Sequence, residues 1–141
     1  MTPKERAQKS AAAMWASDAA SQWVGMELTH VDEGRATVQL TLQDHHCNGH
    51  GIGHGGITFM LADTAFAFAC NSRNQSTVAQ NNTITYTRAA QLGDTLSATA
   101  HEVSLTGRSG VYDVAVTNQS GAQIALFRGL SRAIKSQLFC E

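Results

Sequence analysis

The segment that most constrains the fold is almost wholly apolar: residues 57–70 read ITFMLADTAFAFAC and contain one charge, Asp63. A glycine-rich run, NGHGIGHGG, occupies residues 48–56 directly before it. The pattern predicts a helix over about 55–71, and a helix that is apolar all round belongs in a core. A carboxylate there is costly unless it is paired or used, so Asp63 is a candidate functional group.

Strand patterns lie on both sides of this helix. The order of elements is one N-terminal helix, two strands, the central helix and four strands, joined late in the chain by hairpin-length connections. We therefore predict an α+β fold in which a curved antiparallel sheet wraps around one long central helix. The predicted N-terminal helix runs over about 3–20, and the predicted strands cover 25–31, 36–42, 77–88, 94–105, 110–117 and 123–134.

Length and composition set the broad class. A chain of 141 residues with 43% hydrophobic content predicts a single domain over 1–141, with the additional helix in 1–20 and a short tail at 135–141. A formal net charge of −1 gives no footprint for nucleic acid. No stretch approaches the roughly 18 apolar residues of a membrane span, and no signal core is evident, so we expect no membrane partner. Three cysteines without framework spacing indicate reduced thiols and a cytoplasmic location.

The glycine-rich run has three other interpretations. Residues 51–56 satisfy G-x-G-x-x-G, but no strand precedes them and no acidic residue follows about twenty residues later, as a dinucleotide site requires. A metal site is disfavoured because the intervening glycines disrupt any helix that would align the histidines, so we expect neither metal nor other cofactor. A purely structural role for Asp63 stays open. The potential metal ligands are His45, His46, Cys47, His50 and His54.

A catalytic interpretation uses each of these features. The first turn of a helix presents unpaired N–H groups and a partial positive charge. Gly55 and Gly56 leave room for a carbonyl oxygen, which the Gly55 N–H would polarise. Asn48 would add a side-chain donor, and His54 would orient Asn48 or the leaving group. Asp63 would orient water or attack the acyl carbon itself.

Helix geometry separates the two halves of this site. Gly55 and Asp63 are eight residues apart, about 12 Å along a helix that rises 1.5 Å per residue. One small acyl carbonyl does not reach both. Two such helices packed antiparallel about a two-fold axis would bring Gly55 of one chain near Asp63 of the other, so the spacing predicts a site shared within a homodimer.

These residues resemble a known family. Asn48, the His54-Gly55-Gly56 triplet and Asp63 nine residues after His54 are similar to the hotdog-fold acyl-CoA thioesterases. Residues 62–72 and 127–132 resemble the phenylacetate-degradation (PaaI-type) branch in particular, and the similarity runs over about 26–134.

The resemblance implies specific roles. Asp63 would activate water or act as nucleophile, the Gly55 N–H and the Asn48 amide would polarise the thioester carbonyl, and His54 would support that pair. The resemblance also implies a homodimer, and a dimer of dimers (homotetramer) as the larger assembly. Related enzymes place Ser or Thr beside the water on the next strand; here Ala79 aligns with that place, and the candidate substitutes are Thr77, Gln80 and Asn81.

The implied substrate is acyl-CoA, with aryl-acetyl-CoA or hydroxylated aryl-acetyl-CoA as the first to test. Arginine side chains together with backbone N–H donors suit the CoA phosphates. Phe59, Phe66 and Phe68 are candidates for the lining of the pocket. Two alternatives are a non-catalytic acyl-CoA binding protein and a hotdog-type enoyl-CoA hydratase or dehydratase. The candidate substrate-binding residues are Gly56, Phe59, Thr64, Thr77, Asn81, Arg88, Arg108, Ser109, Gly110 and Arg128, with Arg132 as a further phosphate candidate.

Overall fold

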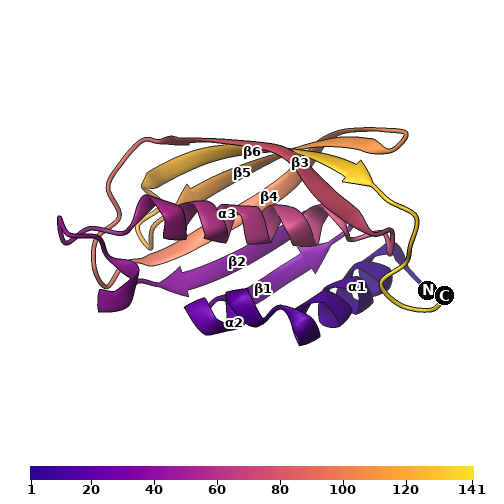
Figure 1. Ribbon diagram of the computed structural model, residues 1–141, viewed down its shortest axis with the longest axis horizontal. Helices are drawn as coiled ribbons and strands as arrows, with labels where there is room; N and C mark the ends of the chain where they lie inside the picture. The colour runs from indigo at the N-terminus through magenta and orange to yellow at the C-terminus, as the bar shows by residue number, and fades with distance from the viewer.

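A computed structural model describes residues 1–141 as three α-helices, one short 3-10 turn and six strands (Figure 1). The long helix α3 lies in the curve of the sheet. The helices α1 and α2 lie on the side of α3 opposite β5 and β6. The elements in chain order are α1 Pro3–Ser17, α2 Ala19–Val24, β1 Glu27–Asp32, β2 Arg35–Thr41, the 3-10 turn η1 Asp44–His46, α3 Gly55–Cys70, β3 Thr77–Tyr86, β4 Thr95–Thr106, β5 Ser109–Thr117 and β6 Gln123–Ala133.

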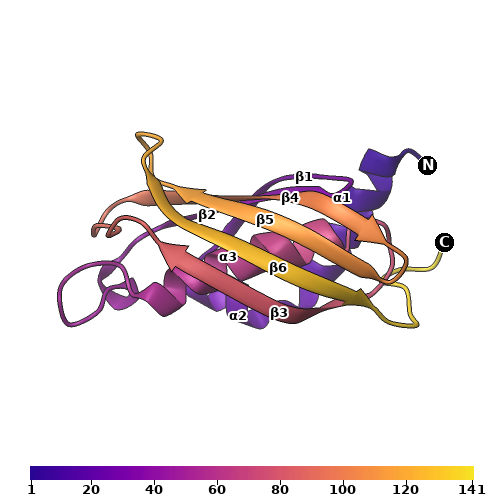
Figure 2. The same ribbon diagram turned by 90° about the horizontal axis from the view of Figure 1, so that it is seen from above.

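The six strands form one sheet in the order β1-β2-β4-β5-β6-β3, and every neighbouring pair is antiparallel. Figure 2 shows β3 at the end of the sheet beside β6, with α3 crossing beneath the strands. The predicted architecture, a curved antiparallel sheet around a central helix with extra helical structure at the N-terminus, is confirmed. Because β3 pairs on one side alone, its other edge carries free backbone groups.

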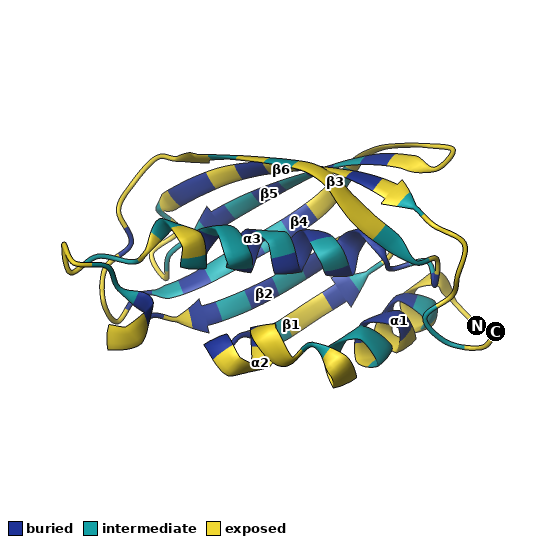
Figure 3. Ribbon diagram, viewed as in Figure 1, coloured by how far each residue is buried: buried dark blue, intermediate teal, exposed yellow.

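The sheet and the N-terminal helices cover most of α3 but not all of it. Its core-facing side chains are buried, whereas a stripe spaced three or four residues apart remains partly or fully exposed: Gly56, Met60, Asp63 and Ala67 (Figure 3). Residues at that spacing share one helix face. The helix predicted to need cover on nearly every side therefore has one face that its own chain leaves open, and Asp63 lies in it.

Aromatic side chains fill the space between α3 and the sheet. The ring of Phe66 packs 5.6 Å from Tyr112 and 5.9 Å from Phe127 between centroids. A Cβ at Gly129 would lie 2.7 Å from the Phe66 ring, so only glycine fits under it. Phe66 and Phe68 are buried core residues. The prediction that they line a pocket is wrong, because the sheet covers Phe66 and Trp15 of α1 packs against Phe68, with 6.2 Å between ring centroids.

The single helix predicted over 3–20 is two helices that break at Asp18. This residue has φ −83° and ψ 73°, and its carboxylate accepts a hydrogen bond from Ser21 N at 3.0 Å, which caps α2. Aspartate favours such a cap over a helix interior. Gly25 then ends α2 in the left-handed region, with φ 96°, so β1 begins at Glu27 rather than at the predicted Gly25. None of the helices is sufficiently long and apolar to cross a membrane.

The short tail at 135–141 is bound to the loop after α3 and to α1. Asn74 Oδ1 accepts hydrogen bonds from the backbone of Leu138 and Phe139 at 2.9 and 3.0 Å. Glu141 forms a two-oxygen ion pair with Arg6 of α1, which holds the pKa of this carboxyl at about 2. The two termini consequently lie at the same end of the molecule (Figures 1 and 2).

Candidate active site

The glycine-rich loop is organised around Asn48. Its backbone N–H donates to Ile52 O at 2.8 Å, and its side-chain Oδ1 accepts from His50 N at 2.9 Å. These bonds fix the side chain while its Nδ2 donates to no group of the chain. The Asn48 side-chain amide is therefore fixed in orientation, and its Nδ2 hydrogens remain free to donate.

His54 caps the helix that follows. Its Nδ1 accepts from Gly56 N at 2.8 Å, and its backbone oxygen accepts from Ile57 N and Thr58 N. A nitrogen that accepts carries no proton, so the neutral ring has its hydrogen on Nε2. These contacts leave the N–H of Gly55 as the one donor of the first turn without an acceptor in the chain.

Tyr86 fixes the first peptide of the helix from the end of β3. Its hydroxyl donates to Gly55 O at 2.7 Å. A Cβ on Gly55 would meet the Tyr86 hydroxyl oxygen at 3.1 Å, which is tighter than an ordinary contact. The glycine is thus needed for close approach as well as for an open N–H. Nothing in the strand pattern of the sequence distinguished Tyr86 from an ordinary exposed strand residue.

A cavity of about 430 Å³ brings several of these groups together. Its walls include Asn48, Gly55, Tyr86 and Arg88, with apolar surface from Ile124. The two residues whose N–H donors lack an acceptor in the chain, Gly55 and Asn48, therefore line one cavity together with Arg88. Asp63 is not among the residues that line it, as expected from the estimated 12 Å separation along the helix.

Asp63 lies partly buried on the open face of α3. Its Oδ1 accepts a hydrogen bond from Asn82 Nδ2 at 2.8 Å, and no Lys, Arg or His pairs with it. Burial raises the pKa of Asp63, and the hydrogen bond from Asn82 opposes that rise. The carboxylate is therefore a stronger base than an exposed aspartate, as a proton acceptor in catalysis requires.

None of the water-partner candidates on β3, Thr77, Gln80 and Asn81, makes a hydrogen bond to this carboxylate. Thr77 binds Asn71 at the far end of the strand through its N–H, at 2.8 Å. Asn81 pairs in register with Leu130, on the outer face of the sheet, away from α3. A bulge between Ala79 and Asn81 shifts the alternation of the strand, so Asn82, which simple counting passed over, is the residue that faces Asp63.

Other substrate-binding candidates have structural contacts. Thr64 Oγ1 lies 3.2 Å from Ser21 Oγ of α2, inside the protein. Arg128 pairs with Asp113 at 2.6 Å on the outer face of the sheet, which directs its charge away from the cavity. Phe59 packs edge-on against Phe127, with 5.5 Å between ring centroids. None of these three residues lines the cavity that contains Asn48 and Gly55.

The hairpin between β4 and β5 carries three further candidates. Arg108 lines a separate hollow of about 320 Å³. Ser109 Oγ accepts from Arg132 at 3.2 Å. A Cβ at Gly110 would lie 2.6 Å from Ser131 Oγ, so this glycine serves packing. The hairpin lies beside the ends of β3 and β6 that are remote from Gly55.

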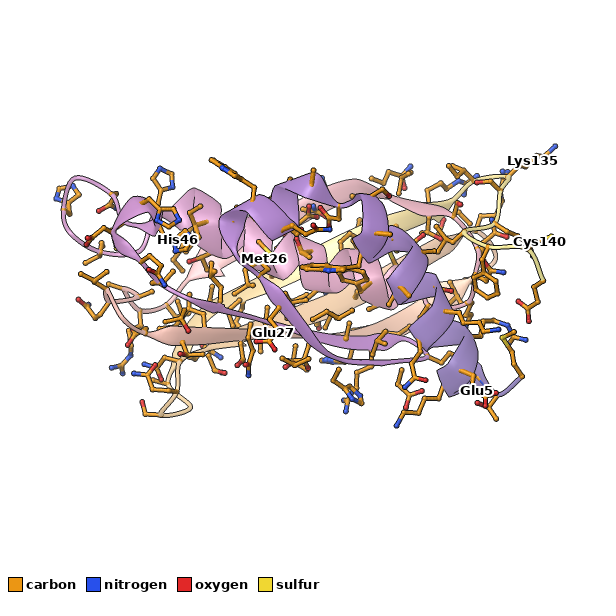
Figure 4. The ribbon with its side chains drawn as sticks, turned by 90° about the horizontal axis from the view of Figure 1, so that it is seen from below. Glu5, Met26, Glu27, His46, Lys135 and Cys140 are labelled. Atoms are coloured by element: carbon orange, nitrogen blue, oxygen red, sulfur yellow. The ribbon has the colours of Figure 1, made fainter.

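The histidines of the loop do not form a metal centre. No group of three or more His, Cys, Asp or Glu side chains is arranged to hold a metal ion. His46 uses both ring nitrogens in the fold: Nδ1 accepts from Gln43 N at 2.9 Å and Nε2 binds Val24 O at 2.7 Å. Figure 4 shows His46 beside the end of α2, where it joins the N-terminal helices to the loop.

Comparisons with known proteins give a consistent picture. Residues 50–125 match the family model described as the thioesterase superfamily. The chain is 43% identical over 129 residues to the acyl-coenzyme A thioesterase PaaI of Escherichia coli K12, covering 92% of each chain. The solved structure of the E. coli PaaI protein from the phenylacetic acid degradation operon superimposes with a TM-score of 0.94 at 41% identity, covering 96% of this chain and 99% of that one.

A second solved structure carries a ligand. A Streptococcus mutans UA159 protein bound to acetyl-CoA has a TM-score of 0.77 and 26% identity, covering 80% of this chain and 91% of that one.

Proposed function

The chain belongs to the thioesterase superfamily, and on that basis we propose that it hydrolyses acyl-CoA thioesters to a free acid and CoA. The observation that carries the proposal is the unpaired Gly55 N–H, which opens into the same cavity as the held amide of Asn48. Two N–H donors at one cavity can stabilise the negative charge that develops on a carbonyl oxygen during acyl transfer. His54 supports the pair by capping the helix through its Nδ1.

Asp63 supplies the second half of the chemistry. As a general base, it takes a proton from water while the water oxygen bonds to the thioester carbon. The carbon–sulfur bond then breaks, and the CoA thiolate takes up that proton, leaving acid and thiol. As a nucleophile, a carboxylate oxygen of Asp63 attacks the carbon and releases the thiolate, and water then hydrolyses the resulting anhydride to the same products.

We assign the two halves of each site to different chains of a homodimer. The open stripe of α3 contains Asp63, which binds Asn82 of β3, and β3 has an unpaired outer edge, so both the stripe and the edge are available to a partner surface. An antiparallel pairing of two α3 helices brings the Gly55 cavity of one chain toward Asp63 of the other. A symmetric dimer then contains two complete sites.

A dimer of dimers is the larger assembly that we propose. The outer face of the sheet carries the exposed apolar side chains of Leu126 and Leu130, with Val111 opposite Leu130 in register. Exposed apolar area of this kind marks contact surfaces.

Three unpaired cysteines, one of them buried, suit the reducing cytoplasm in which we place the reaction.

We propose aryl-acetyl-CoA, or a ring-hydroxylated form of it, as the substrate. The support is the similarity to the PaaI protein of the phenylacetic acid degradation operon, together with the apolar walls that Ile52, Ala90 and Ile124 give to the cavity. Arg88, at the same cavity, is our candidate for a CoA phosphate.

The test is a panel of acyl-CoA substrates assayed by thiol detection, with the Asp63→Asn variant run beside the wild type. We expect thiol release, fastest with phenylacetyl-CoA or its hydroxylated forms, and little release by Asp63→Asn. Tight binding without thiol release would identify a non-catalytic acyl-CoA binding protein. A hydrated product from an enoyl-CoA, with its thioester intact, would identify a hydratase.

A further inference from the structure

Asn82 meets Asp63 in a way that its neighbours on β3 do not. It pairs in register with Gly129, on the inner face of the sheet, while Asn81 and Thr83 pair with Leu130 and Arg128 on the outer face. From the inner face its Nδ2 donates to Asp63 Oδ1 at 2.8 Å. This is the one hydrogen bond that any side chain of the protein makes to the Asp63 carboxylate.

The other end of the same amide has no partner. Asn82 Oδ1 is buried and accepts no hydrogen bond, and Ser10 Oγ is the sole other buried side-chain polar atom in that condition. An unpaired acceptor in the interior lowers stability. The orientation of the amide is nevertheless fixed, because an ionised carboxylate accepts and so must face the Nδ2 donor. Asn82 therefore loses stability at Oδ1 while it holds Asp63 at Nδ2.

We propose that Asn82 is a positioning residue for Asp63, an inference that rests on the thioesterase function proposed above. By occupying Oδ1, the amide fixes the rotation of the carboxyl group and leaves Oδ2 free on the open face of α3. Asn82 also favours the ionised form of Asp63, which is the form that accepts a proton or attacks carbon.

No other group of the chain favours the ionised form of Asp63. Of the two influences on the pKa of Asp63, burial raises it and the hydrogen bond from Asn82 lowers it, and no charged side chain from α1 or the sheet contributes. The titratable group that interacts with the Asp63 charge is Cys70 on the same helix, whose pKa burial raises to about 12, so it stays a neutral thiol. Loss of the Asn82 amide therefore raises the pKa of Asp63 further.

The experiment compares wild type, Asn82→Ala, Asn82→Asp and the matched control Thr83→Ala, which alters the adjacent outer-face residue. For each protein, kcat and KM are measured across pH with the best acyl-CoA substrate, and the Asp63 carboxyl carbon is titrated by NMR. In Asn82→Ala we expect kcat at neutral pH to fall about tenfold with KM nearly unchanged, since the lost contact acts on the base. The acid limb of kcat/KM and the titration of Asp63 both move to higher pH.

Asn82→Asp moves the acid limb still further up, because two carboxyl groups in contact resist double ionisation. Adding Asn82→Ala to Asp63→Asn costs nothing more, since the amide acts through that carboxylate. Thr83→Ala keeps the wild-type profile.

Two outcomes overturn the inference. If Asn82→Ala is folded and retains the wild-type kcat and acid limb, Asn82 does not position the base, while the thioesterase proposal stands. If the rate falls but neither the acid limb nor the NMR titration moves, the effect is merely structural. An inert wild-type protein would instead refute the proposed function itself, and this inference with it.

Discussion

Replacing Gly55 by alanine tests the carbonyl-polarising half of the site. The substitution leaves the N–H in the chain but adds a methyl group where the cavity, the helix end and Tyr86 meet. The added Cβ would lie 3.1 Å from the Tyr86 hydroxyl oxygen and 3.2 Å from its Cζ, against an ordinary contact of 3.4 Å or more. Either the ring or the first turn of α3 must move by a few tenths of an ångström.

The expected cost falls on the rate more than on stability. Tyr86 is 50% exposed, so its ring can shift without opening the core, and alanine is a better helix former than glycine by about 1 kcal/mol. A shift of this size spoils an oxyanion donor: full loss of one costs about 10²–10³-fold in kcat, and a misplacement of 1 Å costs about 10²-fold. We therefore expect kcat to fall by about 10-fold to 100-fold in Gly55→Ala, with a smaller change in KM.

The assay is steady-state thiol release, with thermal unfolding followed in parallel. Gly49→Ala is the matched control, because a Cβ at this glycine of the same loop meets nothing within 4 Å. It should retain wild-type kinetics. If Gly55→Ala is folded and keeps kcat within about twofold of wild type, the Gly55 N–H does not stabilise the transition state. A rise in KM with unchanged kcat would mean that the N–H serves substrate binding alone.

The remaining predictions concern Asp63 and the core. Asp63→Asn should lower kcat by about 10²-fold or more while Tm stays level or rises, since a partly buried charge is removed; calorimetry beside the thiol assay checks both. Because burial raises the pKa of Asp63 in the folded state, its stabilising contribution is present at low pH and is lost as pH rises through that pKa. Urea unfolding at several pH values should show Asp63→Asn lacking this loss. Gly129→Ala should cost about 1–3 kcal/mol in the free energy of unfolding, because its Cβ would lie 2.7 Å from Phe66; an unchanged urea midpoint would contradict that packing.

The architecture could be predicted because its signals are local and repeated. Alternating strands bounded by Gly93, Gly107 and Gly121 predict antiparallel hairpins, and these glycines have positive φ in the structure. The apolar run before and after Asp63 predicts a helix that strands must cover. The helix break at Asp18 does not follow from local propensity, because the alanines on both sides favour a continuous helix, whereas the Asp18 carboxylate caps a second one.

The site could be predicted only in part, because some of its contacts depend on strand register rather than on local sequence. The backbone donor at Gly55 follows from the glycine-rich helix start, and its free N–H is present. The contact between Asn82 and Asp63 depends on a bulge that changes which face of β3 each residue occupies. Such a bulge leaves no clear mark in one sequence. Likewise, the pairing of Arg128 with Asp113 depends on register across two strands.

We propose that Gly55 of one chain and Asp63 of its partner complete one active site. Co-expressing Asp63→Asn with Gly55→Ala, under separate tags, tests it through the isolated mixed dimers. In a shared site, each mixed dimer contains one doubly altered site and one unaltered site, so its activity should recover to about half that of wild type. If both residues act within one chain, every site of a mixed dimer contains one altered residue. Mixed dimers that are no more active than the average of the two variants would therefore contradict a site shared between chains.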